Sequence, residues 1–232
     1  MALVPLNLPA GVYRNGTDLQ SQGRWRDSNL VRWFDDTLRP IGGWRTRSDT
    51  ASAGQVRGMH SWIDNSSDRW ISAGSYNKLY IYSGAGIQYD ITPTGFTAGN
   101  EDALQPVGYG NSFYGQEYYG TARQESVTIT PATTWSSDSW GQYLVACSSS
   151  DGKVYEWQLN TGTIAAVIAN APVNNRSILV TEERFLMCLG AGGNPRLVQW
   201  SDREDNTVWT PAATNEAGSL ELQTTGRIQC GV

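Results

Sequence analysis

The chain has few of the residues from which most catalytic and metal sites are built. It contains one histidine, His60, so a Ser-His-Asp or Cys-His catalytic set would have to be centred there. Its three cysteines, Cys147, Cys188 and Cys230, show no Cys-x-x-Cys spacing, whereas zinc needs several clustered ligands. We interpret His60 as a structural residue in a strand. We therefore predict that the protein is not an enzyme and binds no metal or cofactor.

Charged residues are also scarce, at 17% of the 232 residues, and the formal net charge is −5. This balance argues against a surface that grips phosphates, because nonspecific nucleic-acid affinity comes from basic groups that release counterions. The charge is uneven, since residues 1–50 contain seven arginines and five aspartates and the remainder is acidic. We interpret this start as a solvated arm beside an acidic body, with an electrostatic docking arm as the alternative.

Long apolar runs are missing as well. The first nine residues are mostly apolar, but Pro5 and Pro9 interrupt them and no basic region precedes them, so they suit neither a signal peptide nor a membrane span. An odd number of cysteines without paired spacing favours synthesis in a reducing cytoplasm over a disulfide framework.

Glycine and tryptophan, in contrast, are abundant, with 25 and 10 residues. Glycine supplies positive φ in tight turns and aromatic side chains pack well on a pleated surface, so this composition favours short strands. The clearest example is at 140–159, where strand-like runs at 142–147 and 153–159 flank a Ser-Asp-Gly turn. An Asp-Gly turn between alternating apolar residues is among the strongest hairpin signals.

The hairpin pattern occurs three times, at 70–82, 142–159 and 185–200. Each copy has an apolar strand rich in small residues, a turn, a basic residue and a second strand that ends in an aromatic residue. Cys147 and Cys188 occupy equivalent places in the first strand of their copies, where a free cysteine behaves as a small buried hydrophobe. Internal repetition of this kind indicates a repeat architecture.

Four short strands separated by turns are typical of a propeller blade. We predict an all-β fold: a β-propeller of four-stranded antiparallel blades after an N-terminal arm at 1–53 that contains a β-hairpin. The blades are expected at about 54–93, 134–171 and 177–214, with a fourth begun at 226. Because propellers close with about 4 to 8 blades, we expect a longer chain or neighbouring chains to complete the ring.

Individual strands follow from the same pattern. In the first blade they are predicted at 55–63, 69–74, 78–83 and 87–91, and the last strand of the third blade is predicted at Val208 and Trp209. The partial propeller therefore occupies 54–232.

An insertion at 95–124 separates the first two blades and contains repeated Tyr-Gly pairs without an apolar period, which predicts a long surface loop. In the arm, arginines alternate with tryptophans. This pattern suits either stacking on nucleic-acid bases or packing in a protein interface, and we favour the interface. The candidate assembly residues are Arg24, Trp25, Arg32, Trp33, Arg39, Trp44, Tyr109, Tyr114, Tyr118 and Tyr119.

Two further segments have a weaker chemical signal. The acidic run at 202–206 lacks the glycine and the distal glutamate of a calcium loop, so we interpret it as a turn. The glycine-rich run at 190–195 lacks the Gly-Lys-Ser/Thr ending of a phosphate loop and is interpreted as a hairpin loop. Paired carboxylates for glycoside hydrolysis stay open, because their separation is three-dimensional.

Several runs resemble one known family, the β-propeller nozzle or hub proteins of short-tailed bacteriophages, also called packaged-DNA stabilisation proteins. The resemblance covers most of the chain. It is carried by Gly-Val-Tyr-Arg-Asn-Gly-Thr (11–17), Gly-Arg-Trp (23–25), Asn-Leu-Val-Arg-Trp (29–33), Leu-Arg-Pro-Ile-Gly-Gly-Trp (38–44), Trp-Gly-Gln-Tyr-Leu-Val-Ala-Cys (140–147), Thr-Glu-Glu-Arg-Phe (181–185) and Val-Gln-Trp-Ser-Asp (198–202).

The resemblance implies a structural virion protein of the phage tail that is made in the host cytoplasm. Its copies would form a ring, usually of six, below the portal and adaptor, and the ring would retain the packaged genome and provide the ejection channel. Double-stranded DNA would pass without sequence-specific binding. The alternatives are a carbohydrate-binding or carbohydrate-cleaving propeller that recognises a host surface, and a generic protein-interaction propeller.

Overall fold

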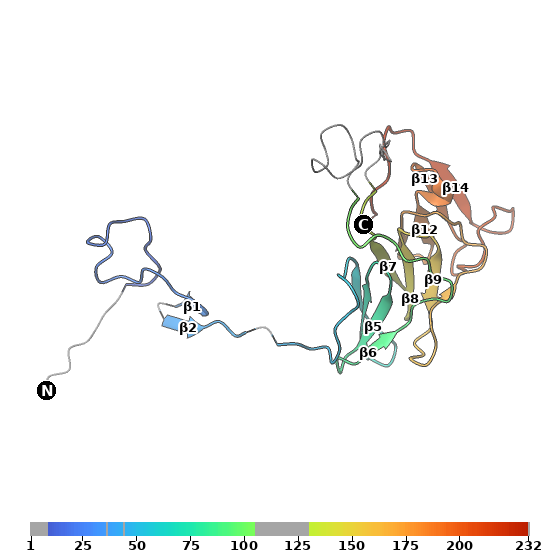
Figure 1. Cartoon of the computed structure of the whole chain (residues 1–232). Helices are drawn as coiled ribbons and strands as arrows, with labels where there is room; N and C mark the ends of the chain where they lie inside the picture. The colour runs from blue at the N-terminus through green and yellow to red at the C-terminus, as the bar shows by residue number, and fades with distance from the viewer. Residues whose placement is uncertain (1–8, 36, 44, 105–129, 232) are drawn as a thin grey trace, which may run out of the picture. The chain divides into compact units, whose positions relative to one another are not determined.

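The computed structural model describes residues 9–35, 37–43, 45–104 and 130–231, which belong to two compact units, Met1–Thr46 and Arg47–Val232. In the described residues, every regular element is a strand except one short 3₁₀ turn, η1 (Ala191–Gly193) (Figure 1). The all-β prediction is confirmed.

The N-terminal unit contains the predicted hairpin. Strand β1 (Val31–Phe34) pairs antiparallel with β2 (Thr37–Pro40), and Asp35 adopts a positive φ of 51° at the connecting turn. Aspartate tolerates this left-handed region better than most residues, which suits it to a tight turn.

The larger unit contains three four-stranded antiparallel sheets, and in each sheet the strands are neighbours in the order in which they occur along the chain. Sheet 1 consists of β3 (Met59–Ile63), β4 (Arg69–Gly74), β5 (Leu79–Ser83) and β6 (Gln88–Asp90). Sheet 2 consists of β7 (Trp135–Trp140), β8 (Tyr143–Ser148), β9 (Val154–Trp157) and β10 (Ala166–Val167). Sheet 3 consists of β11 (Ser177–Val180), β12 (Leu186–Leu189), β13 (Leu197–Trp200) and β14 (Gly218–Glu221).

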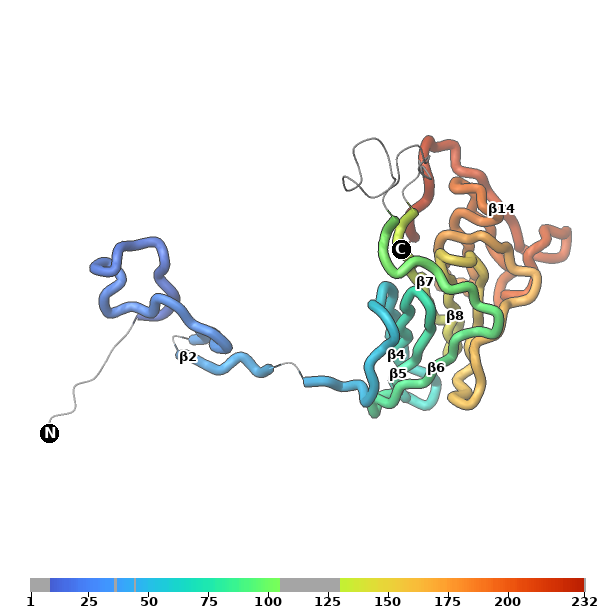
Figure 2. The backbone as a smooth tube through the Cα atoms, viewed as in Figure 1, coloured from blue at the N-terminus to red at the C-terminus, as the bar shows by residue number. Residues whose placement is uncertain are grey.

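The first strands of the three sheets lie side by side, with β3 against β7 and β7 against β11. Figure 2 follows the backbone through this unit, with β4, β5 and β6 of sheet 1 beside β7 and β8 of sheet 2. Side-chain hydrogen bonds join them: His60 Nε2 lies 2.7 Å from Ser139 Oγ, and the Val180 amide donates to Asp138 Oδ2 at 2.7 Å. Residue numbers rise together along each pair of neighbouring strands. Arg57 bonds Trp135 and His60 bonds Ser139, and Ser136 bonds Ile178 as Asp138 bonds Val180, so these three strands are parallel. The described sheets form no closed ring.

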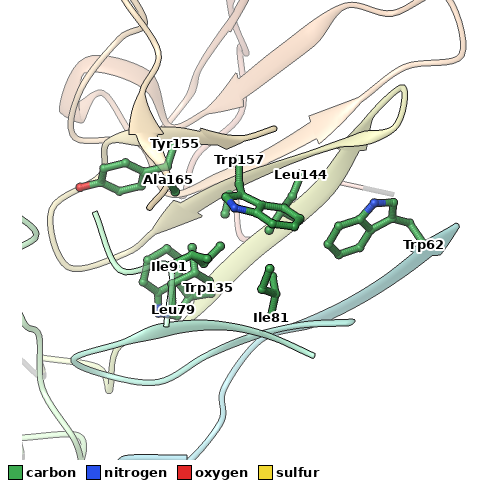
Figure 3. Close-up of a cluster of buried hydrophobic side chains, with 10 residues drawn as sticks. Trp62, Leu79, Ile81, Ile91, Trp135, Leu144, Tyr155, Trp157 and Ala165 are labelled. Atoms are coloured by element: carbon green, nitrogen blue, oxygen red, sulfur yellow. The ribbon is translucent and has the colours of Figure 1, made fainter. Parts of the chain in front are cut away.

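The first core fills the space between sheets 1 and 2 (Figure 3). Trp157 lies in this core and is 1% exposed. Its ring is edge-on to the rings of Trp70 and Trp62, with centroids 5.4 and 6.5 Å away. Trp135 packs directly on Gly74, where an added Cβ would lie 2.2 Å from the indole Cγ. Gly74 is therefore small because the Trp135 ring occupies the space that a side chain would need.

The second core lies between sheets 2 and 3. Along β8, Leu144 and Ala146 belong to the first core, whereas Val145 and Cys147 belong to the second. Successive side chains in a strand point to opposite faces, so this continuous apolar run buries both faces of sheet 2. Sheet 2 is consequently the only one of the three described sheets that contacts a neighbouring sheet on each side.

Cys147 and Cys188 are free and buried as expected, and burial raises the pKa of both thiols. They do not occupy equivalent places, however. Both point into the second core, Cys147 from sheet 2 and Cys188 from sheet 3, so they project from opposite sides of their sheets. The third repeat is therefore offset by one residue, and a shift of one residue exchanges the two faces of a strand.

The end of the chain differs from the prediction. Val208 and Trp209 form no strand, and the fourth strand of sheet 3 is β14, beyond the expected boundary at 214. Trp209 instead reaches the second core from a loop, 3% exposed, with its N–H donating to the Asn206 carbonyl at 2.7 Å. The expected start of a fourth blade at 226 forms no strand among the described residues. There the Ile228 amide donates to the Pro195 carbonyl at 2.9 Å.

Trp157→Ala should lower the free energy of unfolding by about 3 to 5 kcal/mol, because it removes a fully buried aromatic ring between two sheets. Chemical denaturation followed by tryptophan fluorescence and circular dichroism measures this loss. The exposed neighbour provides the control, since Gln158→Ala should change stability by less than about 0.5 kcal/mol. A loss below about 1 kcal/mol for Trp157→Ala would contradict the assigned core.

Candidate assembly surfaces

The described part of the N-terminal unit has no buried hydrophobic side chain. Leu19 is 81% exposed and Phe34 is 55% exposed, and the other exposed apolar residues are Val12, Leu30, Leu38 and Ile41. So small a segment cannot bury enough apolar surface to form a core, and exposed apolar groups of this size are typical of interaction sites. The described part of this unit therefore leaves its apolar side chains in solvent.

The hairpin of the arm divides the predicted interface residues between two faces. Trp33 packs against Trp25 with ring centroids 6.3 Å apart, and the Tyr13 amide ties this region together by donating to the Trp25 carbonyl at 2.8 Å. On the other face, Arg32 and Arg39 are direct cross-strand partners, and Arg39 lies over the Phe34 ring at 4.8 Å.

Two arginines opposite each other on paired strands repel, which costs stability unless an anion neutralises them. Neither Arg32 nor Arg39 forms an ion pair in the part of the chain that the structure describes, and both are exposed. Arg24 is exposed elsewhere in the unit and lies over the Tyr13 ring at 5.1 Å. The Arg32–Phe34–Arg39 face therefore suits an acidic, partly apolar protein surface.

The remaining predicted interface residues are Trp44, Tyr109, Tyr114, Tyr118 and Tyr119, and all five lie outside the described residues. The same holds for most of the predicted insertion at 95–124. Its described beginning is fixed to the body, because the Gly99 amide donates to the Tyr76 carbonyl at 2.8 Å and Arg57 forms an ion pair with Asp102 at 3.0 Å.

Sheet 1 has no neighbouring sheet on the face away from the first core, which we call its open face. The chain itself covers part of it, because Ala73 is 1% exposed and Tyr80 is 7% exposed there, and the Ala53 amide donates to the Tyr80 hydroxyl at 3.2 Å. Alternate residues of β3 point away from the first core, leaving Met59 67% exposed and Ile63 59% exposed. Arg69 is the cross-strand partner of Ile63 and lies on the same face. A cleft of about 550 Å³ opens at this edge of the sheet, and Arg47 and Arg69 are among its lining residues.

Sheet 3 has no neighbouring sheet on the face opposite the second core, which we call its open face. Leu179, Met187, Val198, Trp200 and Leu220 lie on it, together with Leu189, which is 5% exposed. The C-terminal segment covers part of this face, because an added Cβ at Gly231 would lie 2.1 Å from Leu179 Cδ2 and 3.0 Å from Leu189 Cδ1. The Trp200 indole lies flat over Gly218, where an added Cβ would be 2.5 Å from the ring, and its N–H donates to the Glu216 carbonyl at 2.8 Å. Gly218 is thus required for the position of this tryptophan.

Sequence reasoning did not identify these two faces. The apolar residues of β13 occur at adjacent positions, which indicates burial on both sides of the strand but not which side lacks a neighbour. One signal in the sequence did point to these faces: polar and apolar residues do not alternate in β4 of sheet 1 or β13 of sheet 3, as they would in a strand with one solvated face.

The single histidine lies at the junction of β3 and β7. Besides its contact with Ser139, the His60 ring stacks on Trp62 at a centroid distance of 5.9 Å. Burial lowers the pKa of His60, and the nearby Asp138 carboxylate opposes this shift. Asp138 accepts hydrogen bonds from the Ser139 and Val180 amides. Among the described residues no hydrogen bond joins Asp138 to His60, so these three side chains form no Ser-His-Asp triad.

The other chemically suggestive segments have structural roles. In the acidic run at 202–206, Asp205 accepts hydrogen bonds from the Thr207 hydroxyl and amide, which lower the pKa of its carboxyl. The glycine-rich run at 190–195 forms η1 in the loop between β12 and β13, as the hairpin interpretation predicts. Within the described ranges, no cluster of three or more potential ligands is arranged for a metal ion.

Comparisons of the chain with protein-family models, with curated proteins and with solved structures gave no match. In the described part of the chain, no helix has the length and apolar character needed to cross a membrane.

The imidazole of His60 should titrate below its ordinary pKa of about 6.5, because burial penalises the charged form more than Asp138 stabilises it. The unfolded chain then binds a proton before the folded chain does. The contribution of His60 to stability is therefore complete above about pH 6.5 and is lost as the pH falls towards and through the folded pKa.

Proton NMR measures this pKa without ambiguity, since the chain contains one histidine. His60→Gln should remove the corresponding part of the pH dependence of unfolding. An imidazole pKa at or above 6.5 in the folded protein would show that the junction of β3 and β7 is more solvated than described.

Proposed function

We propose that this chain is a structural subunit of a bacteriophage tail and that its copies form a nozzle or hub ring below the portal and adaptor. The observation that carries the proposal is the parallel, side-by-side placement of β3, β7 and β11. Four-stranded meanders whose first strands gather in this way correspond to consecutive blades of a β-propeller. Such a fold provides a central passage lined by those strands.

The composition of the three first strands supports a passage for DNA. They read Met-His-Ser-Trp-Ile, Trp-Ser-Ser-Asp-Ser-Trp and Ser-Ile-Leu-Val, with no lysine or arginine. A channel that binds phosphates tightly would slow a moving genome, because each basic contact adds affinity through counterion release. Hydroxyl groups and a slightly acidic wall would let double-stranded DNA pass without sequence-specific binding.

The resemblance to the tail nozzle proteins supports the same function, and its residues fall on elements that organise the fold. Trp140 ends β7, and the following residues form β8, the most deeply buried strand of sheet 2. The run 198–202 covers the end of β13 and includes Trp200 on the open face of sheet 3. The N-terminal runs form the arm, whose exposed basic and apolar residues suit contacts with neighbouring tail proteins.

A carbohydrate-binding or carbohydrate-cleaving propeller receives less support. A sugar platform needs exposed aromatic rings, whereas Trp62, Trp135, Trp140, Trp157 and Trp209 are buried in the two cores. Three clefts among the described residues carry at most one carboxylate each: Asp151 lines one, Glu156 lines another, and the cleft beside sheet 1 has none.

Gold-labelled antibody raised against the chain should bind phage particles at the tail, directly below the head, when particles from the source phage are examined by electron microscopy. Particles made without the chain should lack this part of the tail and lose their packaged DNA. Label on the capsid surface, or none on intact particles that retain the chain by mass spectrometry, would contradict a tail location. Binding on a glycan array would favour the carbohydrate function instead.

A further inference from the structure

We propose that a pocket at one end of sheets 2 and 3 binds the phosphate group of a small molecule, held by the guanidinium groups of Arg176 and Arg227. The pocket has a volume of about 260 Å³. Four segments line it: the turn between β8 and β9, the segment that leads into β11, the loop between β12 and β13, and the chain after β14. The proposal does not rest on the function in a phage tail.

Hydrogen bonds fix the walls of this pocket. Asn175 is 4% exposed and joins the β8–β9 turn to the segment before β11, because its backbone amide and its Nδ2 both donate to the Gly152 carbonyl, at 3.0 and 2.8 Å. The chain after β14 is attached through the Ile228 amide, which donates to the Pro195 carbonyl at 2.9 Å. The pocket is therefore largely formed before a ligand arrives, and binding has little ordering entropy to overcome.

Two arginines determine the sign of the ligand. Arg176 is half-buried and Arg227 is exposed, and neither forms an ion pair in the part of the chain that the structure describes. Gly190 makes room for the first of them, since an added Cβ there would lie 3.1 Å from Arg176 Cβ. Removing part of a guanidinium from water without a counter-ion costs free energy, and a bound anion would offset that cost.

Positive charge gathers around this pocket although the larger unit is acidic. Residues 47–232 contain 11 basic and 18 acidic residues. Besides the two arginines that line the pocket, Lys153 lies in the β8–β9 turn and Arg196 lies in the β12–β13 loop. Arg196 is already neutralised by Glu221 at 2.5 Å, so the lining arginines and Lys153 supply the charge that a ligand would meet.

One carboxylate also lines the described part of the pocket. Asp151 accepts hydrogen bonds from the Tyr155 hydroxyl and from the Lys153 amide, so each of its oxygens has a donor within the same hairpin. Its negative charge reduces the affinity for every anion, but the lining residues keep an excess of positive charge. A doubly charged anion gains more from this excess than a singly charged one.

A phosphate group matches what the two arginines offer. Each guanidinium presents a planar fork of N–H donors that fits two phosphate oxygens, and a phosphate monoester carries about −1.5 to −2 charge at pH 7. The glycine-rich loop does not act as a phosphate loop, because the amides of Gly190, Gly192 and Gly193 donate to carbonyls of the chain. The phosphates of DNA are diesters with one charge each, so a terminal phosphate of a small molecule is the better match.

Proton–nitrogen NMR of the full 232-residue chain, titrated with inorganic phosphate at constant ionic strength, tests this site. Gly152, Gly190 and Gly193 line the pocket, and their amide signals should shift in a saturable way. Arg176→Gln and Arg227→Gln should each weaken binding by about tenfold or more, because each removes charge-assisted hydrogen bonds. Glycerol phosphate, titrated in parallel, distinguishes the source: tighter binding than inorganic phosphate indicates an organic phosphate, and equal or weaker binding indicates free phosphate.

Arg203→Gln is the matched control, since it makes the same charge change in the exposed loop after β13, at the other end of that strand from the pocket. It should leave the affinity unchanged, and circular dichroism should show all variants folded. The absence of saturable shifts overturns the proposal, and so do shifts that persist in the Arg176→Gln, Arg227→Gln double variant. Binding of a short DNA duplex that phosphate does not displace, and that the double variant loses, would instead assign the arginines to DNA. None of these results bears on where antibody labels a phage particle.

Discussion

The structure depends on the packing of one sheet face against another. Each of the three sheets is only four strands wide, and most of its apolar side chains are removed from water where a neighbouring sheet covers them. Sheet 2 satisfies this condition on both faces, through Trp157 on one side and Cys147 on the other. Sheets 1 and 3 satisfy it on one face each. The order, the cores and the open surfaces of the larger unit all follow from this constraint.

Much of the strand pattern could be predicted from the sequence, because alternation and turn chemistry act locally. Strand β4 occupies the predicted residues 69–74, and the hairpins of all three sheets occur where the repeats indicate. The one-residue offset that turns Cys188 towards sheet 2 could not be predicted, since it leaves composition and spacing unchanged. Trp209 was mistaken for part of a strand because a loop tryptophan that fills a core has the same local signature as a strand residue.

The candidate surfaces were only partly predictable for a related reason. Arginine and tryptophan in the arm indicated contacts, and the hairpin does place Trp33 with Trp25 and Arg32 with Arg39 on separate faces. The open faces of sheets 1 and 3 depend on which sheets lack a neighbour, and that is a property of the tertiary arrangement. The proposed ring would use surfaces of this kind, in which burial is completed by association.

Hydrogen exchange of the 232-residue chain, measured over a range of concentrations, tests most directly whether sheet faces need a neighbouring sheet. Amides of β8 and β9 should be strongly protected at every concentration, because sheet 2 is covered on both faces. Amides of β3 and β13, in the two end sheets, should exchange faster in dilute solution and gain protection as the concentration rises. Equal protection of β3, β8 and β13 at the lowest concentration would contradict this account of the fold.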